Sequence, residues 1–213
     1  FDSTLVHVTK TCRNIGVIFD NMLTFENFVS QKCRSASFGL YKIGKIREYL
    51  DKSTTERLIH AFVMCHLDFC NSLLFGLPSR QIQRLQVIQN SAARLVTKTK
   101  KHESISPVLK LLHWLPVQFR IKFKLLLFAY QCYFNLAPLY LIELLTKYKP
   151  ERNLRSRNKS LFKVPQTATK SYGERSFVYA ASNLWNELPE SLRSISSLEI
   201  FRSHLKTYLF SQQ

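Results

Sequence analysis

The chain has 213 residues, 46% of them hydrophobic, with only 5 Gly and 7 Pro, so a folded and mainly helical protein is expected rather than a disordered one. Lys and Arg number 31 against 14 Asp and Glu, and the formal net charge of +17 points to a polyanionic partner. Five cysteines without a signal peptide favour an intracellular setting, and polar residues interrupt the apolar stretch 123–145, so no membrane span is predicted.

Two short strands are predicted near the start, over residues 5–8 and 15–19, and the second is rich in β-branched residues. Apolar residues recur at three- and four-residue steps over residues 25–50, which predicts a long helix. A second helix is expected to begin at Ser53, because Ser53-Thr54-Thr55-Glu56 has the spacing of a capping box. The first Met is Met22, inside this folded region, so we expect the chain to be part of a longer protein.

The clearest amphipathic helix is predicted over residues 79–98. At about 100° per residue, one face collects apolar side chains, namely Ile82, Leu85, Ile88, Ala92, Leu95 and Val96. Another face, within an arc of about 80°, collects Arg80, Arg84, Arg94 and Lys98. No acidic residue lies between residues 80 and 101.

The second half continues the helical pattern. Helices are expected from Ser106-Pro107 and over residues 116–135, 138–145, 174–188 and 196–210, the last opening with a capping box at 196–199. The helix at 116–135 is apolar nearly all round and should be central to the core, with Arg120 and Lys124 as its polar stripe. Residues 147–171 are expected to be an irregular basic connector with one strand at 161–164.

These elements predict a mainly α fold, a multi-helix bundle with a short N-terminal β-hairpin. We expect three regions: short strands over 1–24, a helical region over 25–101, and a C-terminal helical extension over 102–213.

Six strings, in the same order over about 175 residues, resemble the region that follows the palm in the reverse transcriptases of LINE-type (non-LTR) retrotransposons of the jockey-like group. They are NIGVIFDNMLTFE (14–26), LDFCNSLLFGLP (67–78), LQVIQNSAARLVT (85–97), HWLPVQFRIKFK (113–124), LAPLYLIELL (136–145) and SYGERSFVYAASNLWNELP (171–189). The chain departs from the family pattern at Phe28, at Asn135 and at Ala181-Ser182, which leaves open a decayed copy of the element.

The resemblance implies a thumb and C-terminal extension that hold template–primer and element RNA. The palm that carries the chemistry and the endonuclease would lie upstream in the same polyprotein, and a ribonucleoprotein in nucleus and cytoplasm is implied. Mg would belong to the absent palm, and no cofactor is expected for this part.

Polymerase chemistry needs close carboxylates to hold two metal ions, and no Asp-Asp occurs here. We interpret Asp20 as a helix cap and Asp68 as a buried hydrogen-bond acceptor. Cys65 and Cys70 diverge at helical spacing, so we expect neither a zinc site with His66 nor a nucleophile with His60, but two small core residues. No phosphate-cradling Gly-rich loop occurs, so an enzyme on its own is not expected.

Trp114 and Trp185 stand among apolar residues and are expected to be packing anchors rather than base-stacking platforms. The basic windows 80–101 and 147–163 are instead the predicted phosphate-binding surfaces. The predicted nucleic-acid-binding residues are Arg80, Arg84, Arg94, Lys98, Lys100, Lys101, Arg120, Lys124, Arg152, Arg155 and Arg157. Two alternatives stay open: a protein-interaction scaffold or relic, and an independent nuclease or other enzyme.

Overall fold

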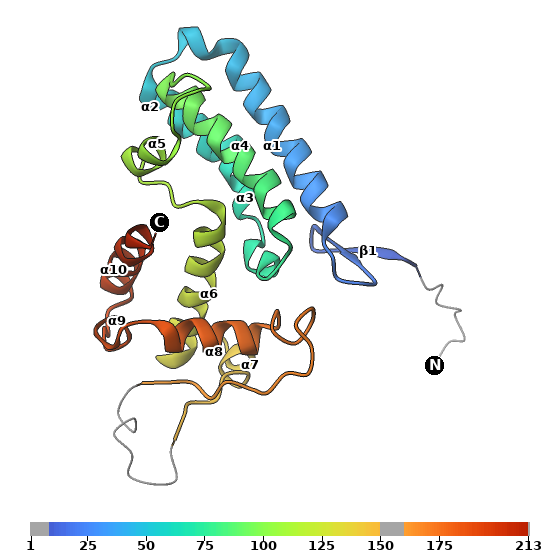
Figure 1. Cartoon of the computed structure of the whole chain (residues 1–213), viewed down its shortest axis with the longest axis vertical. Coiled ribbons are helices and arrows are strands. Elements are labelled where there is room, and N and C mark those ends of the chain that lie inside the picture. Colours follow the sequence, from blue (N-terminus) through green and yellow to red (C-terminus); the bar gives the residue numbers. More distant parts are fainter. Residues whose placement is uncertain (1–8, 150–159, 213) are drawn as a thin grey trace. The chain divides into compact units, whose positions relative to one another are not determined.

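The computed structural model describes residues 9–149 and 160–212 and is mainly helical, with 62% helix and 5% strand, which confirms the predicted fold class. The described chain divides into two compact units (Figure 1). Unit 1 comprises residues 1–70 and 77–108, and unit 2 comprises residues 71–76 and 109–213. No helix in the described ranges is both long and apolar enough to cross a membrane.

Unit 1 begins with an antiparallel hairpin of β1 (Thr11–Asn14) and β2 (Val17–Asp20). Its two-residue turn has positive φ at both positions, 46° at Ile15 and 81° at Gly16, a conformation whose twist suits a tight hairpin. The predicted strand at 5–8 lies outside the described residues. The partner of β2 is instead Thr11–Asn14, a fully exposed segment with no apolar alternation to predict it.

The helices of unit 1 pack against one another as a bundle (Figure 1). They are α1 (Glu26–Ile46) with the 3₁₀ turn η1 (Arg47–Tyr49), then α2 (Lys52–Ile59), the π-helical turn η2 (His60–Met64), α3 (Cys65–Asp68), and α4 (Ser79–Thr97). The core faces of α1 and α4 bury Phe28, Val29, Ala36, Ile43, Leu85, Ile88, Ala92 and Val96. At Gly39 the backbones come so close that an added Cβ would lie 2.5 Å from the Phe62 carbonyl oxygen.

Two acidic residues organise the helix starts of unit 1. The Asp20 carboxylate accepts hydrogen bonds from the backbone N–H groups of Met22, Thr24 and Phe25 at 3.2, 2.8 and 2.7 Å, just before α1. Asp51, not the predicted Ser53, caps α2, because its Oδ1 accepts from Thr54 N at 3.0 Å. Asp is a strong N-cap residue, and Asp51 stands two positions before Ser53, so the helix begins before the predicted capping box.

Unit 2 is built around α6 (Val117–Tyr133), which confirms that the apolar helix predicted over 116–135 is central to a core. Its other elements are η3 (Asn71–Leu74), the end of α5 (Ser106–Leu111), α7 (Leu139–Ile142), α8 (Phe177–Glu187), α9 (Glu190–Arg193) and α10 (Leu198–Ser211). Helices α8 and α10 both pack on α6 (Figure 1). Trp114 and Trp185 are 3% and 0% exposed, so both are packing anchors as predicted.

The segment predicted as a strand at 161–164 is not one. Phe162 makes only an isolated bridge to Lys147, and the side-chain amide of Asn186 brackets it. Phe162 N donates to Asn186 Oδ1 at 2.9 Å, and Asn186 Nδ2 donates to the Phe162 carbonyl at 2.8 Å. Backbone hydrogen bonds from Tyr148 N to the Leu161 carbonyl at 2.9 Å and from Lys163 N to the Thr146 carbonyl at 2.8 Å satisfy the flanking residues, and Asn186 satisfies the backbone groups of Phe162 itself.

Helix ends in unit 2 also differ from prediction. Helix α7 ends at Ile142 rather than 145, and α8 begins at Phe177 after Ser176, whose Oγ accepts from Tyr179 N at 3.4 Å. The predicted capping box at 196–199 does not form, because Ser197 makes no side-chain cap hydrogen bond. The Ser196 carbonyl instead accepts from the Tyr130 hydroxyl at 2.6 Å.

Candidate nucleic-acid interface

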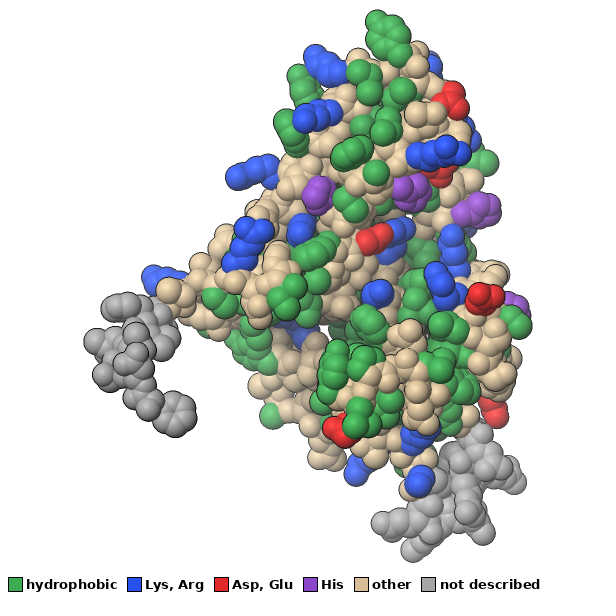
Figure 2. Space-filling model, turned by 180° about the vertical axis from the view of Figure 1, so that it is seen from behind, with side chains coloured by type: hydrophobic (Ala, Val, Ile, Leu, Met, Phe, Trp, Pro, Cys, Tyr) green, Lys and Arg blue, Asp and Glu red, His purple; other side chains and the backbone are tan. Residues whose placement is uncertain are grey.

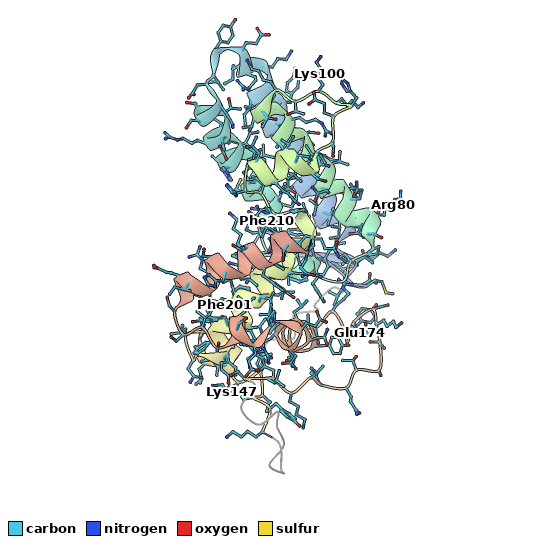
Figure 3. The ribbon with its side chains drawn as sticks, turned by 60° about the vertical axis from the view of Figure 1, so that its left-hand side comes forward. Arg80, Lys100, Lys147, Glu174, Phe201 and Phe210 are labelled. Atoms are coloured by element: carbon cyan, nitrogen blue, oxygen red, sulfur yellow. The ribbon has the colours of Figure 1, made fainter. Side chains whose placement is uncertain are left out.

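Helix α4 presents the predicted basic face to solvent. Pro78 precedes its first turn, and its 19 residues contain no acid. Leu85, Ile88, Ala92 and Val96 are buried on the opposite face, while Ile82 and Leu95 are half-buried. The amphipathic pattern therefore orients the helix as expected. Figure 3 shows Arg80 and Lys100 at opposite ends of α4.

The four cations of this face differ in how they are held. Arg84 Nη2 donates to Ser30 Oγ on α1 at 2.9 Å. Arg94 donates to the carbonyls of Lys100 and Glu103 at 3.4 and 3.1 Å, which folds the following loop back on the helix. Arg80 and Lys98 are exposed, and Lys98 stands just past the helix end in the left-handed conformation, with φ 57°. The direction of the Lys98 side chain is therefore not set by the regular 100° step of the helix.

These groups have no carboxylate partner among the described residues. Within the described part of the chain, none of the six predicted cations in residues 80–101 lies within 4.0 Å of an acidic oxygen. Glu103 bounds the surface, and its Oε1 accepts from the backbone N–H of Lys100 at 3.0 Å. Figure 2 shows far more basic than acidic side chains on the face of the molecule that it displays. The α4 face is thus a stretch of uncompensated positive charge.

The remaining predicted cations lie in unit 2 or outside the described residues. On α6, Arg120 is half-buried and Lys124 is exposed, with its Nζ 5.0 Å from the centre of the Phe128 ring. Lys122 is also partly open and lies 5.7 Å from the Phe119 ring centre, so Arg120 and Lys124 are not the only polar stripe of the helix. Arg152, Arg155 and Arg157 belong to residues that the structure does not describe.

Among the residues that the structure describes, no group of three or more His, Cys, Asp or Glu could hold a metal ion. Cys65 and Cys70 were expected in the core but are exposed. The π-helical turn η2 immediately precedes Cys65, and Cys70 lies beyond the end of α3 with a φ of 50°, so neither residue follows the regular helical projection.

Sequence reasoning also missed the exposed cations of α1. Arg34, Lys42 and Lys45 lie on the solvent face of that helix, and Lys42 and Lys45 each stand over an aromatic ring one turn earlier. The signal was present as Phe-x-x-x-Lys and Tyr-x-x-x-Lys spacing within one helix.

Three kinds of comparison with known proteins gave no match. No protein-family model, no curated protein and no solved structure matches this chain. The candidate interface therefore rests on the geometry and charge of the described residues.

Proposed function

We propose that this chain is a nucleic-acid-binding part of a retrotransposon RNA-directed DNA polymerase, which grips template–primer or element RNA and leaves catalysis to a palm elsewhere in the polyprotein. The observation that carries the proposal is the exposed face of α4, whose cations have no carboxylate partner in the described chain. Such a face suits phosphates, because each neutralised phosphate releases counterions.

The bonds within the protein position the guanidinium groups without neutralising them. Arginine has five N–H donors. Arg84 commits one of them to Ser30, and Arg94 commits two to backbone carbonyls, so both keep donors for an external anion. A preorganised guanidinium loses less side-chain entropy on binding phosphate than a free one.

The length of the face suits a polynucleotide. Arg80 and Arg94 are fourteen residues apart in one helix, which corresponds to about 21 Å along its axis. Successive phosphates of one strand are about 3.4 Å apart along a duplex, so the face spans about six of them. Contacts to phosphates carry no sequence information, and the grip would be tolerant of sequence.

The family assignment within this proposal is supported by the six strings quoted above, in their shared order. It implies RNA and DNA as partners, together with the palm and endonuclease of the polyprotein, and Mg only at the palm. Reading the coding sequence upstream of Phe1 tests it directly: an intact aromatic-x-Asp-Asp strand turn supports the assignment, and an unrelated upstream domain contradicts it.

A protein-interaction scaffold is the second candidate, and one observation favours it. Leu136, Leu139 and Tyr140 in unit 2 are 57%, 69% and 67% exposed, which is unusual for large apolar side chains close together. Displacement of a bound partner protein by acidic peptide but not by RNA would favour this function over nucleic-acid binding.

The test of nucleic-acid binding is the salt dependence of affinity. Changing Arg80, Arg84, Arg94 and Lys98 together to Ala should reduce the slope of log affinity against log salt by about 3, since each lost phosphate contact removes about 0.7 to 0.9. Fluorescence anisotropy with duplex and structured RNA measures it.

The matched control removes the same charge elsewhere, by changing Lys52, Arg57, Arg202 and Lys206 to Ala. These four side chains are exposed on α2 and α10. Equal slopes for the two quadruple variants would mean that net charge alone drives binding, and the α4 face would lose its assigned role.

A further inference from the structure

The exposed face of α1 carries aromatic rings among cations. Phe38 and Tyr41 are 58% and 61% exposed. At about 100° per residue, both fall within an arc of about 100° together with Arg34, Lys42 and Lys45. The core face of the helix, with Phe28, Val29, Ala36 and Ile43, points the other way. The two rings are therefore not needed to bury α1.

Each ring is paired with a lysine one turn later. Lys42 Nζ lies 4.4 Å from the centre of the Phe38 ring, and Lys45 Nζ lies 5.3 Å from the centre of the Tyr41 ring. Tyr49, at 87% exposed, continues the series after the helix. Rings that alternate with cations along one open face are the arrangement by which proteins hold single-stranded nucleic acid, stacking bases while contacting phosphates.

We propose that this α1 face binds unpaired nucleotides, with bases stacked on Phe38 and Tyr41 and phosphates held by Arg34, Lys42 and Lys45. The proposal rests on the proposed function and specifies its ligand class. Bases inside a duplex have their faces covered by neighbouring bases, so only an unpaired strand can stack on these rings. Stacking of a base on an aromatic ring is stronger than an exposed cation–π contact, so a base displaces each ammonium group toward the phosphates.

Charge favours a nucleic acid over a protein as the occupant. The stretch from residue 27 to residue 47 contains Lys32, Arg34, Lys42, Lys45 and Arg47 and no acid, and Glu48 follows only in η1. An apolar protein surface would gain from the rings but would have to cover three lysine or arginine heads on the same face. A single strand offers flat bases and anionic phosphates together.

This face adjoins the α4 face within unit 1. Arg84 of α4 bonds to Ser30 near the start of α1, and Arg47 at the end of α1 bonds to the Leu95 and Val96 carbonyls near the end of α4. The two helices therefore run parallel, and the edge of α4 that carries Arg84 lies beside α1. One nucleic acid can contact both faces, with phosphates on α4 and unpaired bases on α1.

The test uses two probes that differ only in their bases: a fluorescent single-stranded oligothymidylate of about twelve nucleotides and an abasic oligomer of equal length. Changing Phe38 and Tyr41 together to Leu should weaken oligothymidylate binding about tenfold or more, with the salt slope and the abasic affinity unchanged. Changing both to Trp should preserve affinity and add Trp fluorescence that the oligothymidylate quenches and the abasic oligomer does not.

The matched control is Tyr140→Leu with Tyr148→Leu, which removes two partly exposed rings from unit 2 and should leave both affinities unchanged. Far-UV circular dichroism verifies that all variants fold. Unchanged oligothymidylate binding by the α1 Leu variant overturns the proposal, as does an equal loss for both probes. An acidic peptide that displaces oligothymidylate from the wild type but does not bind the Leu variant assigns the face to a protein partner and also overturns it.

The α4 quadruple variant, measured on the abasic oligomer in the same assay, separates this inference from the proposed function. If that variant loses abasic binding while the α1 Leu variant binds oligothymidylate normally, the phosphate grip stands and the stacking face fails. If the wild type binds neither probe, nor duplex nor structured RNA, both fail.

Discussion

A cluster of aromatic side chains fills the core of unit 2, whereas the Phe38 and Tyr41 rings of α1 in unit 1 are exposed. In unit 2, Tyr130 stacks on Phe201 with ring centres 4.3 Å apart, and Tyr133 stacks on Trp185 at 5.4 Å. Phe162 closes the cluster against Trp185 at 5.8 Å. On α1 the rings of Phe38 and Tyr41 meet lysines and solvent instead. The same residue types therefore provide a core in one unit and a candidate ligand surface in the other.

Unit 1 also contains an arginine that is buried in its helical bundle. Arg47 in unit 1 is 8% exposed and donates to the carbonyls of Leu95, Leu50 and Val96 at 2.7, 2.7 and 3.0 Å. Its charge faces the C-terminal end of α4, where the helix dipole is negative. Unit 2 also buries an arginine, Arg193, at 6% exposed, so the two units differ in the rings that unit 1 exposes on α1.

The largest expected effect follows from removing the ring at the centre of unit 2. Trp185→Ala should lower the free energy of unfolding of unit 2 by about 4 kcal/mol, because it leaves a large cavity and orphans the Ser160 carbonyl that accepts from Nε1 at 2.7 Å. Denaturant unfolding followed by the fluorescence of Trp114 measures it. Trp185→Phe should cost clearly less, and equal losses for the two variants would contradict a packing role.

The second largest loss of stability is expected when the buried Arg47 of unit 1 is replaced. Arg47→Met should lower the stability of unit 1 by about 3 kcal/mol, since three carbonyls lose charge-assisted hydrogen bonds. Hydrogen exchange of the last turns of α4 measures the loss locally. Arg57→Met, at an exposed position of α2, is the matched control and should change stability by less than about 0.5 kcal/mol.

A smaller effect on stability is expected at Asp20, just before α1 in unit 1. Burial by itself raises the pKa of Asp20, but the hydrogen bonds from Thr24, Phe25 and Met22 outweigh it and lower the pKa below the usual range. Asp20→Ala should therefore cost about 1 kcal/mol at neutral pH.

The pH dependence of that loss follows from the lowered pKa. The stabilisation by the Asp20 carboxylate is fully present above its unfolded pKa and disappears as pH falls through the lower folded pKa. Unfolding of wild type and variant at pH 6 and at pH 2 to 3 should show the difference shrinking. A difference that persists unchanged in acid would assign the effect to packing.

The smallest effect on stability is expected from the thiols. Cys65 and Cys70 in unit 1 are exposed, whereas Cys132 in unit 2 is buried, and burial raises the pKa of the Cys132 thiol. A thiol reagent should modify the first two at neutral pH without unfolding the protein, and Cys132 roughly a hundredfold more slowly, at the rate of local opening. Mass spectrometry of modified peptides gives each rate, and fast labelling of Cys132 in the native protein would contradict a rigid unit 2 core.

Local patterns in the sequence were sufficient to predict the helical fold, the central position of the α6 segment and the outward basic face of α4. Helical period determines which side chains share a face, and a segment without acids keeps its positive charge wherever the helix packs. The burial of Trp114 and Trp185 followed from their apolar neighbours in the same way.

Contacts between residues far apart in the chain decided the rest. Arg47 bonds to the end of α4, 48 residues later, and the Asn186 side chain bonds to the backbone of Phe162 across 24 residues. Cys65 follows a π-helical turn and Cys70 lies beyond the end of α3, and both are exposed. The packing of α1 against α4 and η2 left Phe38 and Tyr41 in solvent. Periodicity identifies the faces of a helix, but only the neighbours that cover those faces determine which side chains remain available to a ligand.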